Sequence, residues 1–346
     1  MNDPRMSLAL VKAAAATGFA LAAALPAAAQ TNLTMSSWVP PSHSVTKTLA
    51  AWGQDVEKAS NGRVKITMLP KAPSAPTGTL DSVISGLVDI SFISHGYTPG
   101  RFALTKVAEL PFLGDNAEIT SVAYHRINER TLLKAGEYKG LKVLAAFTHG
   151  PGTVATTKKP IRTLADAAGM KIRVGGGMMH DVANAIGVNA LLKPAPELYE
   201  LLTGNVVDGT FGPSEMVISF KIEKVLKYLT KVPGGLYNTA FTVLISEDRF
   251  NKIPQQDRDV MLSLSGERLA RRIGADWDKV EKAADEAMKA NNIQVIRASP
   301  ALVKEIRDKT AGLEQAWVKE AGGKGVDPAK ALAELRAEIK KVSAGK

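Results

Sequence analysis

The chain has 346 residues, of which 45% are hydrophobic, and a formal net charge of +10. This composition is that of a folded globular protein and excludes an intrinsically disordered chain. The absence of Cys excludes disulfides and thiol catalysis, so stability has to come from a large hydrophobic core.

The N-terminus has the layout of a secretory signal peptide. Arg5 and Lys12 carry positive charge, residues 13–25 are uncharged and apolar, and the Ala run at 27–29 offers a cleavage site before Gln30. The apolar stretch is shorter than the roughly 20 residues that a membrane-spanning helix needs, although a membrane anchor is the alternative. We therefore expect residues 1–29 to be a signal peptide that exports the chain.

Strand and helix patterns alternate along the first part of the mature chain. Residues 33–37 and 64–68 predict strands, and the apolar stripe from 45 to 56 predicts an amphipathic helix between them. A second helical stripe at 80–87 precedes a buried strand at 89–93. This β-α-β order predicts a parallel or mixed sheet with helices on both faces.

The same alternation restarts in the middle of the chain. Further strands are predicted at 141–147, 170–174, 206–210 and 237–245, with helices at 178–186, 197–203, 255–291, 301–320 and 328–343. The stretch 255–291 contains almost no helix breaker, so one long helix is expected there. With no linker or internal repeat, about 317 mature residues predict two α/β halves with several crossings between them.

The charge pattern argues against a nucleic-acid partner, and the motifs of common enzyme classes are absent. Lys and Arg alternate with Asp and Glu along helical stretches such as 279–289, which is typical of solvated helix faces, and aromatic residues make up only 5% of the chain. We therefore expect no nucleic-acid partner. The sequence has no G-x-S-x-G, H-E-x-x-H, Walker or G-x-G-x-x-G motif. A hydrolase or lyase that uses His95 or His149 is the alternative from a different class.

One segment of the chain resembles a known protein family. Residues 160–174 read P-I-R-T-L-A-D-A-A-G-M-K-I-R-V, which resembles the P-I-x-x-x-x-D-x-x-G-x-K-x-R-V segment of the substrate-binding proteins of TRAP (tripartite ATP-independent periplasmic) transporters, the DctP-like family. Further blocks resemble the same family in the same order, at 86–90, 109–112, 197–199 and 204–209. The resemblance covers nearly the whole mature chain.

The resemblance implies a two-lobed, periplasmic binding protein-like α/β fold with crossing strands, a long bracing helix and C-terminal helices. Residues 30–150 with about 239–275 are expected to form lobe I, and 151–238 with about 276–346 lobe II. It implies a periplasmic protein that is not an enzyme, has no cofactor and delivers a small organic carboxylate to a membrane permease. A monomer is the default expectation. The binding component of an ATP-driven importer is the alternative.

The resemblance also assigns Arg173, the arginine of the K-x-R motif, to a two-pronged ion pair with the ligand carboxylate. The physics agrees, because a guanidinium presents paired N–H donors that match the two oxygens of a carboxylate. A structural salt bridge is the alternative for Arg173.

Three positions depart from the family pattern. The second arginine that many members carry before the P-I dipeptide falls on Gly152 here, and the V-D-G-x-E-N-P block has Phe211 and Gly212 in place of its two polar residues. Some members hold their ligand through a metal near this block, and Glu215 could serve as a metal ligand here. Because Phe211 and Gly212 offer no ligand atoms, we expect no metal.

The remaining site candidates predict an apolar or aromatic body behind the carboxylate. Trp38 stands where the family's first ligand-facing loop begins, and Met178 and Met179 follow the strand that carries Arg173. Aromatic and Met side chains line apolar pockets, which disfavours a ligand as rich in hydroxyls as sialic acid. Core packing is the alternative for Trp38, Met179 and Phe211. The candidate substrate-binding residues are Arg173, Trp38, Phe211, Met178, His95, Gly150, Gly212 and Asn238.

Overall fold

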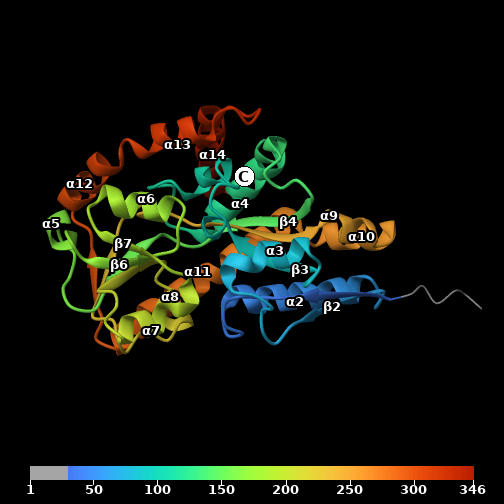
Figure 1. The fold of residues 1–346 in the computed structure, drawn as a ribbon, viewed down its shortest axis with the longest axis horizontal. Helices are drawn as coiled ribbons and strands as arrows, with labels where there is room; N and C mark the ends of the chain where they lie inside the picture. Colours follow the sequence, from blue (N-terminus) through green and yellow to red (C-terminus); the bar gives the residue numbers. More distant parts are fainter. Residues whose placement is uncertain (1–29) are drawn as a thin grey trace, which may run out of the picture.

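The computed structural model describes residues 30–346, and the expected signal peptide lies outside these described residues. Two β-sheets form the centres of two lobes that lie side by side (Figure 1). Within the described residues, no helix is both long enough and apolar enough to cross a membrane.

The first sheet has five strands in the order β2-β1-β3-β10-β4. Their bounds are β1 (Thr31–Met35), β2 (Val64–Met68), β3 (Ile90–Ser94), β4 (Leu141–Thr148) and β10 (Ala240–Ser246). Strands β1, β2 and β3 are parallel, whereas β10 lies antiparallel between β3 and β4. The chain therefore returns to this sheet for β10 after it has built most of the second sheet.

The second sheet has six strands in the order β11-β9-β5-β8-β6-β7. Their bounds are β5 (Thr153–Thr156), β6 (Lys171–Val174), β7 (Asn189–Leu192), β8 (Gly209–Gly212), β9 (Tyr228–Lys231) and β11 (Gln294–Arg297). The chain crosses between the sheets after β4, after β9 and after β10, as the alternation without a linker predicted.

The helices cover both sheets and extend along one edge of the molecule. Their bounds are α2 (Ser44–Ala59), α3 (Thr79–Ile84), α4 (Ala117–Arg130), α5 (Leu164–Ala167), α6 (Met178–Ala185), α7 (Leu198–Thr203), α8 (Met216–Ser219), α9 (Glu247–Asn251), α10 (Gln255–Ser263), α11 (Gly266–Ala290), α12 (Pro300–Thr310), α13 (Leu313–Ala321) and α14 (Pro328–Ser343). The prediction of one helix over 255–291 was wrong, because the chain leaves the helical conformation at Ser265 and Gly266 takes a φ of +65°.

Helix α11 spans both lobes. It packs against α4, β4 and α2 of the first lobe and against α8 and β11 of the second. A single apolar stripe produces this arrangement, because Leu269, Ile273 and Trp277 lie in the core of the first lobe while Met288 lies in the core below the second sheet. The expected bracing helix is therefore present, in a form shorter than predicted.

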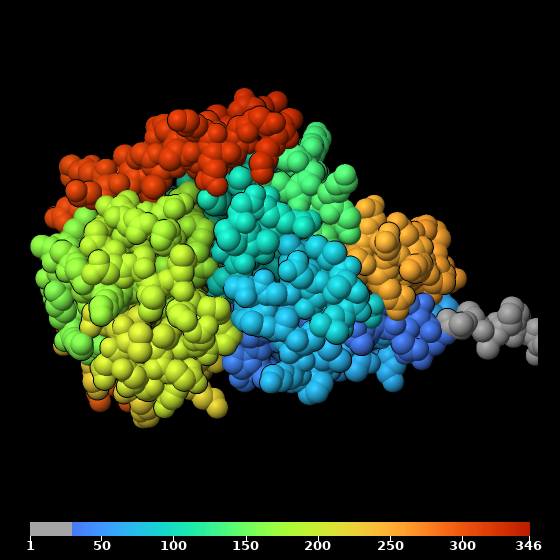
Figure 2. Space-filling model, viewed as in Figure 1, coloured from blue at the N-terminus to red at the C-terminus, as the bar shows by residue number. Residues whose placement is uncertain are grey.

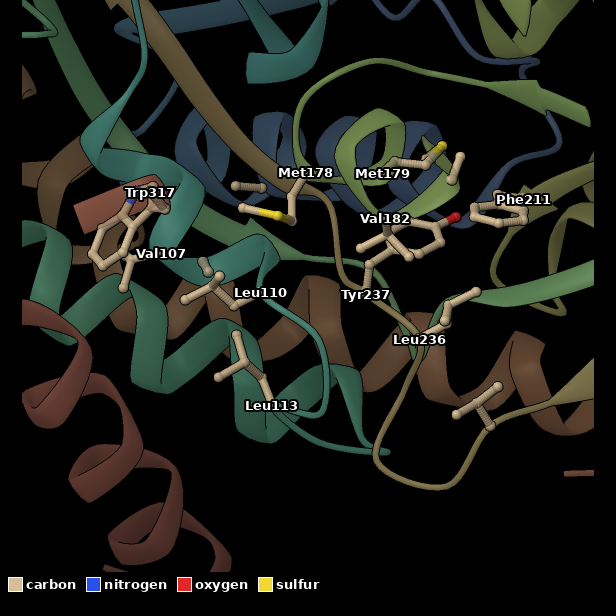
Figure 3. Packing of buried hydrophobic residues seen from close by; sticks show 14 of the residues in the cluster. Val107, Leu110, Leu113, Met178, Met179, Val182, Phe211, Leu236, Tyr237 and Trp317 are labelled. Carbon is tan, nitrogen blue, oxygen red and sulfur yellow. The ribbon is translucent and has the colours of Figure 1, made fainter. Parts of the chain in front are cut away.

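The C-terminal helices join the lobes from outside. Helix α12 packs against α5 and α6, whereas α14 packs against α4 and the 3-10 helix η3 (Leu104–Glu109). In Figure 2 this segment runs along one edge of both lobes. Figure 3 shows Trp317 of α13 in one apolar cluster with Met178 and Leu110. Residues 276–346 thus contact both lobes.

Candidate functional site

Arg173 lies at the junction of the two lobes. In β6, the flanking Ile172 and Val174 are fully buried in the core, so the alternation of the strand turns Arg173 to the opposite face. Its Nε donates to the carbonyl oxygen of Lys193 at 2.7 Å and its Nη2 to the hydroxyl of Tyr97 at 3.1 Å. The whole residue is only 3% exposed.

The guanidinium of Arg173 has donors left over. It carries five N–H groups, and the two hydrogen bonds leave three of them free. Among residues 30–346, no Asp or Glu oxygen lies within 4.0 Å of this guanidinium. A buried cation without an acidic partner is costly, so the site favours an anion from outside the protein. A structural salt bridge, the alternative role for Arg173, would need an acidic side chain that the described residues do not provide.

Tyr97 supplies a second donor at the same place. It ends the 3-10 helix η2 (His95–Tyr97), which follows β3 in the first lobe. Its hydroxyl oxygen accepts from Arg173 and, at 3.0 Å, from the backbone N–H of Ala195. Both lone pairs are then occupied and the O–H itself remains free to donate. Tyr97 was not among the predicted site residues, and the turn after β3 brings it to Arg173 from the other lobe.

Aromatic rings form the walls of the pocket beside Arg173. Trp38 lies 4.8 Å from Phe92 and 5.6 Å from Tyr97 between ring centroids, and its Nε1 donates to the carbonyl oxygen of Phe92. Phe241 stacks on Trp277 at 5.9 Å. All five rings line one pocket with Arg173. Flat apolar walls of this kind suit an aromatic or branched apolar body.

A buried pair of His43 and Glu215 also lines the pocket. His43 Nε2 lies 3.2 Å from Glu215 Oε1, and both side chains are 2% exposed. His43 Nδ1 accepts from the backbone N–H of Val45 at the start of α2, so the ring proton sits on Nε2 and points at Glu215. Burial alone would raise the pKa of Glu215, but His43 and the hydroxyl of Ser219 lower it, which keeps this carboxylate ionised.

Several contacts hold the lobes together around the pocket, and three of them are of different kinds. Tyr97 with Arg173 is the first, and His43 with Glu215 is the second. The third is backbone against backbone, because a Cβ on Gly176 would overlap the carbonyl oxygen of Gly96. Gly176 also has a φ of +91°, which favours glycine. The structure is therefore a closed form, in which the three glycines at 175–177 serve close approach of the lobes.

Three of the predicted site residues line this pocket, namely Arg173, Trp38 and Gly212. Phe211 does not. It is fully buried and stacks on Tyr237 at 5.8 Å, as Figure 3 shows. Because consecutive residues of β8 face opposite sides, Gly212 can face the pocket only if Phe211 points into the core.

Met178 and Met179 take the opposite places from those expected. Met178 points into the core toward Leu110, and Met179 lines the pocket beside Arg173. His95 lies in a neighbouring hollow, where its Nε2 is 2.8 Å from the hydroxyl of Thr242. Burial lowers the pKa of His95 to about 3.

Gly150 and Asn238 lie at the crossings between the lobes and do not line the pocket. The amide of Asn238 is 3.2 Å from the carbonyl oxygen of Gly150. Gly152, where many family members have arginine, has no room for a side chain. A Cβ there would lie 2.6 Å from the carbonyl oxygen of Tyr237 and would also overlap its ring. The ring of Tyr237 takes that space.

The family model of the bacterial extracellular solute-binding proteins, family 7 (DctP), matches residues 35–320. The chain belongs to this family. The expected resemblance is therefore confirmed, and so are a solute-binding role rather than an enzymatic one and the two-lobed α/β fold. Among residues 30–346, no three His, Asp or Glu side chains are grouped as a metal site would require.

Solved structures and a curated protein agree with this membership. A TRAP periplasmic solute-binding protein from Bordetella bronchiseptica with bound (R)-mandelate and (S)-mandelate is 46% identical, with a TM-score of 0.88 over 90% of this chain and 99% of that one. A TRAP solute-binding protein from Rhodoferax ferrireducens T118 with copurified benzoate is 27% identical, with a TM-score of 0.86 over 91% and 99%. The outer membrane transporter protein TsaT of Comamonas testosteroni is 30% identical over 286 residues, 82% of this chain and 84% of that protein.

Proposed function

We propose that this DctP-family protein is the periplasmic receptor of a TRAP transporter for a small aromatic carboxylate. The observation that carries the proposal is the buried guanidinium of Arg173, which lines an aromatic pocket with free donors and without an acidic partner among residues 30–346. The ligand carboxylate accepts from Arg173 and from the O–H of Tyr97, and its ring packs among Trp38, Phe241 and Trp277.

The polarity of the pocket supports one orientation of the ligand. Glu215 lines the same pocket and is ionised, so its charge repels a second carboxylate. A four-carbon dicarboxylate would have to place an anion among the aromatic rings or beside Glu215, and a sugar acid would bury hydroxyls against apolar walls. The aromatic acids bound by the Bordetella and Rhodoferax proteins have the shape that these constraints select.

Delivery of the ligand to the permease depends on closure of the two lobes around it. Arg173 belongs to the second lobe, whereas Trp38, Tyr97 and Phe241 belong to the first, so a bound acid contacts both lobes and stabilises the closed form. The closed receptor then presents the ligand to a membrane permease driven by an ion gradient. Export by the signal peptide at 1–29 places the receptor in the periplasm.

A thermal-shift screen of carboxylates tests the proposed ligand class. Benzoate, mandelate and branched alkyl acids are expected to raise the melting temperature in a concentration-dependent way, because a ligand that binds only the folded state stabilises it by mass action. Acetate, succinate and gluconate are expected to leave it unchanged at the same concentration. A preference for gluconate or succinate over every aromatic acid would reject the proposed ligand class.

A further inference from the structure

His149 lies in the pocket without a role in the ion pair. It follows the last residue of β4, is 3% exposed, and packs against both Phe241 and Trp277 at ring-centroid distances of 6.1 and 6.0 Å. Its Nδ1 contacts the carbonyl oxygen of Gly150. A carbonyl oxygen can only accept, so the Nδ1 of His149 carries the ring proton.

The second ring nitrogen of His149 is therefore an acceptor. Burial lowers the pKa of His149 to about 4, so the imidazole is neutral at pH 7 and Nε2 holds a lone pair. Nε2 is buried and has no hydrogen-bond partner among the described residues. Proteins leave few buried polar atoms unsatisfied, so this atom in the wall of a ligand pocket points to a group on the ligand.

The chemistry around His149 limits what that group can be. A carboxylate would meet both a lone pair and the ionised Glu215, which lies close enough to influence the charge of His149. An apolar group would leave Nε2 unpaired. A neutral donor satisfies Nε2 without adding charge, and a hydroxyl is the smallest such group on an aromatic acid.

We propose that Nε2 of His149 accepts a hydrogen bond from a hydroxyl of the bound ligand, so that the pocket selects hydroxylated aromatic carboxylates over their unsubstituted counterparts. This inference rests on the proposed function, because the carboxylate has to occupy Arg173 for the hydroxyl to reach His149. Arg173 and Tyr97 then act as the donor end of the pocket, and His149 as its acceptor.

Two matched pairs of acids test this by isothermal titration calorimetry at pH 7. Mandelate is compared with phenylacetate and 3-hydroxybenzoate with benzoate, since each pair differs by one hydroxyl. We expect the wild type to bind the hydroxylated member of at least one pair about tenfold more tightly. His149→Phe should reduce that ratio to about one while it leaves the affinity for the unsubstituted member within a few-fold. Phe220→Leu, at another position in the pocket wall, should keep the ratio.

His149→Leu provides a second variant without a hydrogen-bond acceptor, should the Phe variant fold poorly. It should bind the unsubstituted acids and reduce the ratio to about one. Equal wild-type affinities within both pairs would overturn the role of His149 but not the proposed function, and so would a ratio that His149→Phe or His149→Leu retains in full. Failure of all four acids to bind the wild type would reject the proposed function together with this inference.

Discussion

The hydroxyl of Tyr97 in the first lobe accepts a hydrogen bond from the guanidinium of Arg173 in the second, at 3.1 Å. The same oxygen accepts from the backbone N–H of Ala195 at 3.0 Å. One tyrosine therefore ties the lobes together, orients the arginine and keeps its own O–H for a third partner. Closure and ligand recognition depend on the same side chain.

Replacing Tyr97 with Phe should weaken binding of benzoate by about 1–3 kcal/mol, the usual contribution of a hydrogen bond to a charged group. Calorimetry measures this. Tyr199→Phe is a matched control, because Tyr199 is 46% exposed on α7, outside the pocket. Equal affinities in wild type, Tyr97→Phe and Tyr199→Phe would show that Tyr97 does not contact the carboxylate.

Ligand entry requires the lobes to separate, because Arg173, His149 and Glu215 are all buried in the closed form. We expect small-angle scattering to give a smaller radius of gyration with saturating benzoate than without ligand. Bending should concentrate where strands cross between the sheets, near Gly150 and at Gly234 and Gly235, whose φ values are +83° and +80°.

Arg173→Ala at the same benzoate concentration should give the profile of the empty protein, which separates ligand-driven closure from effects of the solution. Identical profiles of the wild type with and without saturating ligand would indicate a preformed pocket and contradict the hinge.

Glu281 on α11 should make stability depend on pH. Burial and the charge of Glu215 raise the pKa of Glu281 to about 8, whereas the unfolded carboxyl titrates near 4.5. Between these values the unfolded chain loses the proton that the folded chain keeps, so this residue lowers stability as pH rises from about 4.5 to 8.

Glu281→Gln removes that titration and keeps an oxygen for the backbone N–H of Glu215, which lies 3.3 Å from Glu281 Oε1. By urea denaturation, the variant should gain stability over wild type by about 1–3 kcal/mol at pH 8 and by much less at pH 5. Glu286→Gln, an exposed position on the same helix, should show no such trend. A gain that is equal at both pH values would contradict the assignment.

Long periodic segments of the fold were predictable from sequence, whereas three of the short strands were not. The stripe from Val45 to Val56 and the alternation at 64–68 gave α2 and β2. Strands β5, β9 and β11 are only four residues each, too short to show a period on their own, and their pairing with distant strands defines them. The break between α10 and α11 was not predictable, because it depends on the backbone angles of Ser265 and Gly266 within an otherwise helical pattern of residues.

Part of the site was also predictable from sequence, and part was not. The K-x-R motif identified Arg173, but Tyr97 is 76 positions away in sequence and meets it only when the lobes close. Its place directly after the buried strand β3 was the available signal, because ligands of α/β sheets bind beyond the carboxyl ends of strands. Phe211 was predicted in the pocket because it replaces a polar residue of the family block, but β8 at Gly209–Gly212 turns its side chain inward.

The role of Arg173 is tested most directly by calorimetry of benzoate binding to wild type, Arg173→Ala and Arg173→Lys, each first shown by thermal unfolding to be folded. Arg173→Ala should lose about 2–5 kcal/mol of binding free energy, the cost of removing one partner of a buried charge pair. Arg173→Lys should recover only part of it, since a point charge cannot reproduce the paired donors. Near wild-type affinity of Arg173→Ala for benzoate would contradict the ion pair on which the proposed function depends.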